Sequence, residues 1–121
     1  METVSRERMG AGHYTPGMDR REAFAHEGAW AGTVTMEPGS ASGWHHHGGH
    51  ASYLFVRSGR ARFETADGGA HDCEAGHFIF IPPEEVHREV NPGDEPSEVV
   101  LFRVGTGEVV VNVEREGGAS R

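Results

Sequence analysis

The segment Trp44-His45-His46-His47-Gly48-Gly49-His50 constrains this chain more than any other feature of its sequence. It holds four of the nine histidines. In an extended chain successive side chains alternate faces, so His45 and His47 point the same way while His46 points opposite. Two imidazoles at this spacing form half of a site for a divalent metal, for which neutral His is the commonest protein ligand. The alternative is an exposed polar loop; a tag remnant is excluded because the run is internal.

A second stretch, residues 76–91, has the pattern of an apolar strand, a turn and a histidine that opens the next strand. Apolar side chains occupy both parities from Phe78 to Ile81, which predicts a strand covered on both faces. Pro82 and Pro83 end strand pairing, because neither has a backbone N–H to donate. His87 follows this turn and is the third candidate metal ligand.

The two stretches together resemble the two motifs of the cupin family. The first motif, G-x5-H-x-H-x3,4-E-x6-G, is matched by Gly39, His45, His47 and Gly59. The second, G-x5-P-x-G-x2-H-x3-N, is matched by Gly76, Pro82, His87 and Asn91, with Glu84 in place of the turn glycine. The resemblance covers about residues 28–112 and implies an all-β fold, the double-stranded β-helix of the cupin or jelly-roll barrel. The chain is similar to small, single-domain members of the family.

One departure from the family pattern concerns the glutamate of the first motif. That residue would fall at position 51 or 52, where this chain has Ala51 and Ser52, and neither can replace a carboxylate ligand. The resemblance therefore implies a three-histidine site from His45, His47 and His87. His50 is a candidate fourth ligand, because a bulge at the two glycines before it would turn its ring inward.

The overall composition limits the class of partner. The net charge is −8, from 11 basic and 19 acidic residues, and no basic cluster offsets it. Nucleic acid and anionic membrane surfaces are therefore not expected as partners. The single Cys73 excludes an internal disulfide and fits a reducing compartment. Without an 18-residue apolar stretch or a leader pattern, no membrane span is expected and the predicted location is cytoplasmic.

The order of segments predicts one barrel with two flanking extensions. Apolar, strand-like runs recur at short intervals between turns, and 18 glycines support many turns. Residues 1–20 are expected to form an N-terminal arm, 21–113 the cupin barrel, and 114–121 a flexible tail. An open sheet edge and a polar arm that cannot pack on itself predict a homodimer, in which the first strand or the arm pairs with the neighbouring barrel.

The expected function is that of a metal-dependent enzyme acting on a small organic substrate. A metal on three neutral imidazoles keeps its +2 charge, which favours an anionic ligand. Nitrogen ligands do not select among Fe, Zn, Ni, Mn and Cu. Among small cupins, a three-His iron site resembles the sites of thiol and diketone dioxygenases, and a four-His site resembles those of zinc polyketide cyclases. The alternatives are a non-redox cyclase, isomerase or lyase, and a non-catalytic small-molecule-binding cupin.

Four further side chains are candidates for the substrate pocket. Trp44 and Tyr53 are candidates to line the cavity, and His26 lies on a predicted strand that could face it. Arg57 interrupts an apolar strand, where it could anchor a substrate carboxylate. The sequence assigns no catalytic residue.

Overall fold

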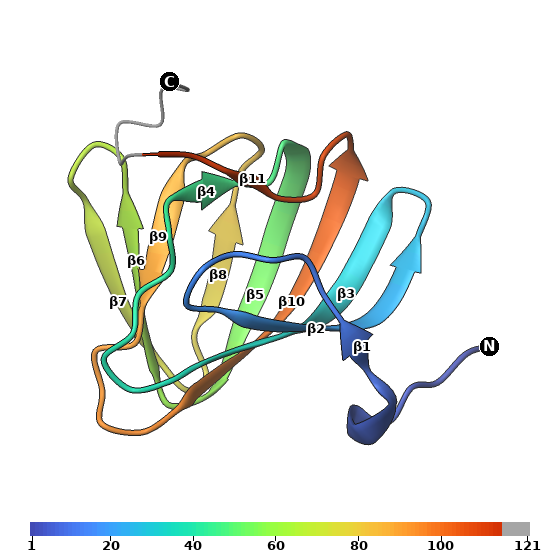
Figure 1. Ribbon diagram of the computed structural model, residues 1–121, viewed down its shortest axis with the longest axis horizontal. Helices are drawn as coiled ribbons and strands as arrows, with labels where there is room; N and C mark the ends of the chain where they lie inside the picture. Colours follow the sequence, from blue (N-terminus) through green and yellow to red (C-terminus); the bar gives the residue numbers. More distant parts are fainter. Residues whose placement is uncertain (115–121) are drawn as a thin grey trace.

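The computed structural model describes residues 1–114, and almost all of its regular structure is β-strand (Figure 1). This confirms the predicted all-β fold. A short 3-10 helix, η1 (Arg6–Arg8), precedes the strands β1 (Gly10–Ala11), β2 (Asp19–His26), β3 (Ala29–Met36), β4 (His45–His46), β5 (Gly49–Ser58), β6 (Arg60–Thr65), β7 (Ala70–Glu74), β8 (Phe78–Ile81), β9 (His87–Val90), β10 (Ser97–Thr106) and β11 (Val111–Asn112). Within residues 1–114, no helix is long and apolar enough to cross a membrane.

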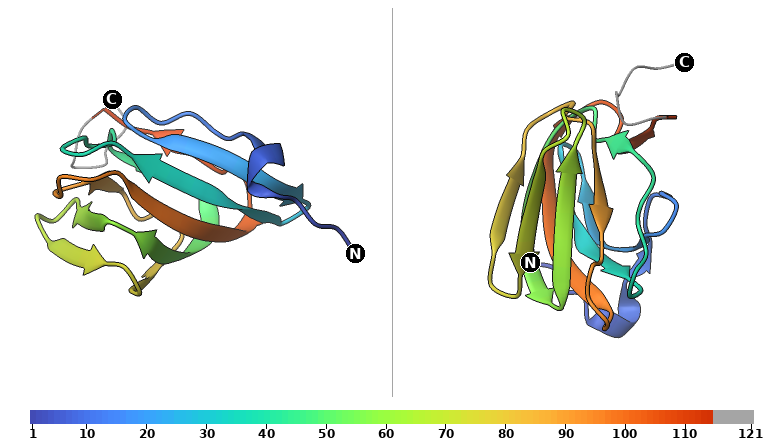
Figure 2. Two further views of the ribbon diagram at one scale, coloured as in Figure 1. Left: turned by 90° about the horizontal axis from the view of Figure 1, so that it is seen from below. Right: turned by 90° about the vertical axis from the view of Figure 1, so that its left-hand side faces the viewer.

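The strands form two antiparallel sheets that face each other (Figure 2). The larger sheet has the order β1-β2-β3-β10-β5-β8, and the smaller has the order β11-β4-β9-β6-β7. Consecutive strands often lie in different sheets, so β4 and β5 belong to opposite sides of the barrel. Residues distant in sequence are therefore brought to one interior.

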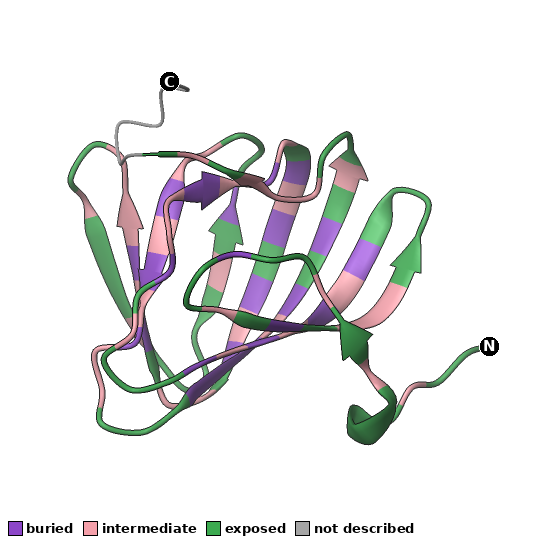
Figure 3. Ribbon diagram, in the orientation of Figure 1, coloured by how far each residue is buried: buried purple, intermediate pink, exposed green. Residues whose placement is uncertain are grey.

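Burial alternates along the central strands, as expected where one face of a sheet covers a core (Figure 3). The alternation buries Trp30, Val34 and Met36 on β3, and Ala61 and Phe63 on β6. These side chains meet inward residues of the other strands, and the apolar core consists of Trp30, Val34, Leu54, Val56, Ala61, Phe63, Ile81, Val99 and Leu101.

The prediction that strand β8 is covered on both faces is wrong. Phe78 is 81% exposed and Phe80 is 54% exposed, whereas Ile81 is buried. Phe78 and Phe80 of β8, an edge strand, face the outer side of the larger sheet, which no described residue covers. A run that is apolar on both parities can belong to an edge strand with an exposed aromatic face, and sequence periodicity does not separate the two cases.

The N-terminal residues contact their own barrel. β1 pairs with β2 in the same chain, and β2 itself begins at Asp19, inside the segment expected to be an arm. The Arg6 guanidinium donates two hydrogen bonds to the Glu98 carboxylate on β10, at 2.6 and 2.8 Å. The segment 1–20 is thus attached to the larger sheet. Of the predicted tail, residues 115–121 lie outside the described residues.

The pairing of Glu98 predicts a pH dependence of stability. Hydrogen bonds from Arg6, together with those from Arg57, lower the pKa of the Glu98 carboxyl to about 2, from an ordinary value of 4.5. The folded state therefore binds this proton less readily than the unfolded state. The resulting stabilisation is fully present above about pH 4.5 and is lost as the pH falls towards 2. We expect Glu98→Gln to lower the free energy of unfolding at pH 6 and to have little effect near pH 2, as measured by urea denaturation.

Glu37→Gln is the matched control, because Glu37 is exposed. It should change stability little at either pH. An equal loss of stability in Glu98→Gln at both pH values would contradict the assignment.

Candidate metal centre

Two of the predicted histidine ligands lie on directly paired strands. His45 opens β4 and His87 opens β9, and the two residues are antiparallel partners. Their side chains are 0% and 2% exposed. β4 is only two residues long, because the chain must turn at Gly48, whose φ of +55° lies in the left-handed region. His47 lies between the short strand and this turn, and it is also buried.

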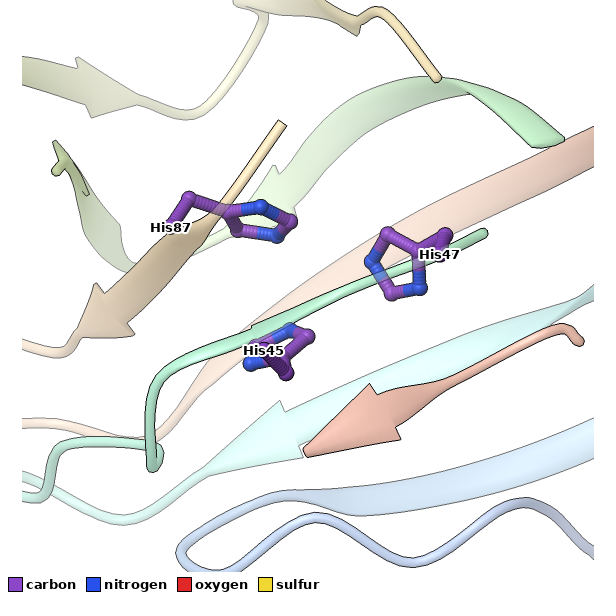
Figure 4. Close-up of side chains that lie close together, drawn as sticks. All are labelled: His45, His47 and His87. Carbon is purple, nitrogen blue, oxygen red and sulfur yellow. The ribbon is translucent and has the colours of Figure 1, made fainter. Parts of the chain in front are cut away.

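The three rings gather around one space inside the barrel (Figure 4). One nitrogen of each of His45, His47 and His87 lies within 4.8 Å of the corresponding nitrogens of the other two. The ring centroids of His45 and His87 are 4.4 Å apart, and each lies 5.1 Å from that of His47. The structure therefore brings together residues separated by 40 positions, as the motif spacing predicted.

Each ring is oriented by a hydrogen bond from its Nδ1 atom to a backbone carbonyl. The acceptors are the oxygens of Gly43 for His45, of Val109 for His47 and of Glu85 for His87, each at 2.9 Å. Since a carbonyl only accepts, Nδ1 carries the proton and donates it. The Nε2 atom of each ring is then left with a free lone pair, which is the form that binds a metal.

Burial keeps the imidazoles of His45 and His47 neutral. It lowers the pKa of His45 to about 3, with a further contribution from the nearby His87. Burial, followed by the charge of Arg103, lowers the pKa of His47 well below its ordinary range. Within the described chain the buried Nε2 atoms of His45 and His87 have no hydrogen-bond partner. Two buried lone pairs without donors, beside a third neutral imidazole, fit a divalent metal ion.

A carboxylate that the sequence reasoning missed lies beside the rings. Glu89 on β9 is 2% exposed. One of its oxygens, Oε2, lies 3.7 Å from Nε2 of His87 and 3.8 Å from Nε2 of His45. Burial opposes ionisation of Glu89, but the contact with His87 and the charge of Arg20 outweigh it and lower the pKa of this carboxyl. Strand alternation could have found it, because residues 87 and 89 share a face.

His50 is turned towards the barrel interior but is separate from the three-ring cluster. It is 5% exposed and shares the inward parity of β5 with Ser52 and Leu54. Its Nδ1 lies 3.2 Å from the carbonyl oxygens of both His47 and Glu108. His50 also lines a cavity of about 470 Å³ at the rim of the barrel. Its role as a fourth ligand stays a prediction.

The other pocket candidates lie away from the three rings. Tyr53 is 51% exposed, and its ring lies 5.2 Å from that of Phe80 on the outer side of the larger sheet. The Arg57 side chain is 51% exposed and pairs with Glu98. Trp44 is half-buried beneath the guanidinium of Arg88. His26 is exposed and bonds to Glu2, and it lines the same rim cavity as His50.

Two buried arginines in the interior were not predicted from the sequence. Arg20 on β2 and Arg103 on β10 are 3% and 2% exposed. The Arg103 guanidinium lies 5.2 Å from the ring centroid of Trp30. Burial, then the charge of Arg20, lowers the pKa of Arg103 to about 9, so it is still charged at neutral pH. Two buried cations therefore belong to the same interior as the histidine cluster.

Comparison with known proteins agrees with the motifs and the topology. The family described as "Cupin domain" matches residues 32–103, more than half of the chain. The chain belongs to the cupin family. The sequence matches no curated protein.

Solved structures show the same fold at low sequence identity. The polyketide cyclase RemF from Streptomyces resistomycificus superposes with a TM-score of 0.77 at 17% identity, over 98% of this chain and 90% of that one. A Klebsiella pneumoniae protein with a double-stranded β-helix domain has a TM-score of 0.74 at 20% identity, and the match covers 87% of this chain and 91% of that one. A predicted oxalate decarboxylase from Thermotoga maritima has a TM-score of 0.73 at 19% identity, and the match covers 88% of this chain and 100% of that one. The expected double-stranded β-helix is thereby confirmed.

The geometry predicts which substitutions weaken metal binding. We expect His87→Ala to weaken the binding of Zn²⁺ or Co²⁺ to the untagged protein by at least about 10–100-fold, the loss known for outer partners of metal ligands. Glu89→Gln should weaken it by roughly tenfold or more, because the site loses its neighbouring negative charge. Isothermal titration calorimetry measures both effects.

Two histidine variants make this test selective. His71→Ala is the control, because His71 is exposed on β7. His50→Ala distinguishes the possible ligand sets: unchanged affinity would place His50 outside the metal's ligands, whereas a loss as large as that of His87→Ala would indicate a four-histidine site. Unchanged affinity in His87→Ala would contradict the metal centre itself.

Proposed function

We propose that this cupin is a metal-dependent enzyme that acts on a small anionic organic substrate. The observation that carries the proposal is the state of the three buried rings. Their Nδ1 atoms are bound to backbone carbonyls, while the Nε2 atoms of His45 and His87 face the interior without a partner in the described part of the chain. Such an arrangement costs stability in the absence of a ligand, so a bound metal gives it a physical reason.

The residues of the site each have a role in this proposal. His45, His47 and His87 hold the metal, and the three carbonyls fix the direction of the rings. Glu89 lowers the net charge of the centre from +2 to +1, which leaves it attractive to an anion. A divalent metal held here supplies Lewis-acid polarisation of a bound oxygen or, if it is redox-active, binding of O2. The rim cavity beside His50 and His26 gives a small molecule access to the interior.

Two reaction classes are compatible with the site. The first is dioxygenation, which the three-histidine set favours by its resemblance to small iron cupins. The second is a non-redox reaction such as polyketide cyclisation, which the structural likeness to RemF supports. A binding cupin without chemistry is the remaining alternative. It is weakened by the cluster of three buried imidazoles, which a simple binding pocket does not need.

Elemental analysis combined with activity assays tests the proposal. Protein purified without a histidine tag should contain about one divalent metal per chain, and His87→Ala should not. The iron-loaded protein is then assayed for O2 uptake with small thiols, diketones and phenolic acids, and the zinc-loaded protein for cyclisation or isomerisation of the same compounds. O2 uptake that His87→Ala abolishes supports a dioxygenase, and turnover with zinc alone supports the second class. A wild-type protein that retains no metal after loading and dialysis would overturn the proposal.

The predicted homodimer has a candidate surface on the larger sheet. Tyr53, Phe80 and Phe102 are 51–54% exposed on neighbouring strands β5, β8 and β10, next to the more exposed Phe78. An apolar face of this kind is typical of a protein interface. Light scattering at micromolar concentration should give the mass of two chains, and Phe80→Lys should reduce it to one. A monomeric wild type would contradict the prediction. The homodimer and the cytoplasmic location both stay predictions.

A further inference from the structure

The buried polar atoms without a partner are concentrated in one part of the molecule. Within residues 1–114 they are Nε of Arg20, Nε2 of His45, Oγ of Ser52, Nε2 of His87, and Nε and Nη1 of Arg103. Native proteins leave few such atoms unsatisfied, so a group of them marks a place suited to a polar or ionic ligand. A metal accounts for the two imidazole nitrogens. The remaining atoms are nitrogen donors and one hydroxyl, and a metal cation does not account for them.

Two of the donor residues are direct neighbours across the sheet. Arg103 on β10 is the antiparallel partner of Ser52 on β5. Both side chains face the interior, at 2% and 1% exposure. On its other side Arg103 is paired with Trp30 of β3, whose ring lies beneath the guanidinium. Ser52 lies on the same inward face of β5 as His50, two residues away.

Ser52 occupies the position of the missing family glutamate. In the first motif six residues separate the glutamate from the following glycine, and six residues separate Ser52 from Gly59. Where the motif carries a carboxylate, this chain therefore has a hydroxyl opposite an arginine. The local charge changes from negative to positive, and the site offers donors in place of an acceptor.

The charges of the interior do not balance without a ligand. Arg20 and Arg103 are buried cations, and Glu89 is the buried carboxylate near them. The other buried carboxylate in the described chain, Glu98, is already bound by Arg6 and Arg57 on the outer side. One positive charge remains before any metal binds, and buried charges are normally paired. An anion is the ligand that satisfies both the charge and the free donors.

We propose that Arg103 and Ser52 form an anion-binding subsite beside the metal centre, and that it takes the carboxylate of a small organic acid. Arg20 supplies further positive charge, while its Nη1 atom is held by Thr15 Oγ1 and the His13 carbonyl oxygen. The proposal rests on the proposed function only for the status of that acid as a substrate. In the family motif a glutamate of the protein supplies a carboxylate at this position, whereas here the bound acid supplies it.

Matched pairs of acids and amides test the subsite. Benzoate is compared with benzamide, and pyruvate with pyruvamide, by calorimetry on metal-free and zinc-loaded wild-type protein. We expect each acid to bind at least about tenfold more tightly than its amide in both forms, which is the low end of what a hydrogen bond to a charged group contributes. Equal binding of acids and amides by the wild type would overturn the subsite.

Variants assign the preference to the two residues. Arg103→Gln should bring the acid-to-amide ratio close to one, and Ser52→Ala should reduce it severalfold, while zinc stoichiometry stays unchanged. Arg62→Gln is the control, because it removes an equal charge from the exposed Arg62–Asp72 pair. If Arg103→Gln fails to fold, Ser52→Ala still decides, because it removes a single oxygen atom; unchanged acid affinity there would overturn the assignment.

The outcomes separate this proposal from the proposed function. An acid preference that appears only with zinc and persists in Arg103→Gln would show that the metal alone holds the carboxylate. The subsite would then be wrong and the metal centre right. A protein that binds no zinc but retains an Arg103-dependent preference for acids would show that the subsite is right and the metal centre wrong. Inorganic phosphate is titrated as well, and binding tighter than that of both acids would overturn the assignment to a carboxylate.

Discussion

The hydrogen bond from each ligand imidazole to a backbone carbonyl is the interaction on which the rest of the site depends. For His45 and His87 the acceptor lies two residues earlier in the chain, on Gly43 and Glu85. The same local contact therefore orients a ring on each of two paired strands. Because this contact fixes which nitrogen carries the proton, the lone pairs that we propose to bind the metal are already present in the folded protein without an ion. The cost of ordering the ligands is met during folding.

The interior of the barrel combines an apolar core with a polar cluster. Leu101 and Val56 are fully buried in the core, whereas Arg103, only two residues from Leu101 on the same face of β10, belongs to the polar cluster. Buried guanidinium groups contribute little to stability unless their partners are present. We therefore expect the apolar half to stabilise the fold and the polar half to reduce that stability in favour of ligand binding. Such a local conflict with folding rules is typical of functional sites.

The sequence predicted those parts of the site that depend on spacing alone. The two motifs identified the fold and the three histidines, since fixed intervals in a barrel of this type map to fixed positions. Glu89, Ser52 and Arg103 were harder to assign, because their roles depend on which strands become neighbours and on the register between them. Arg103 pairs with Ser52 across 50 residues of intervening chain, and no local pattern encodes that pairing. Arg57 is the opposite case, because a charged residue in an apolar strand is easy to notice in the sequence. Its partner, Glu98, lies on the outer side of the sheet and not in the site.

His47 differs from the other two histidines because its acceptor is distant in sequence. Its Nδ1 proton goes to the carbonyl of Val109, which is 62 residues later. During synthesis on the ribosome, the first motif leaves the exit tunnel long before this carbonyl is made. The ring of His47 consequently has no fixed direction until the chain has been extended past residue 109. If the proposed metal binds here, its loading into the final geometry follows elongation of the chain past Val109.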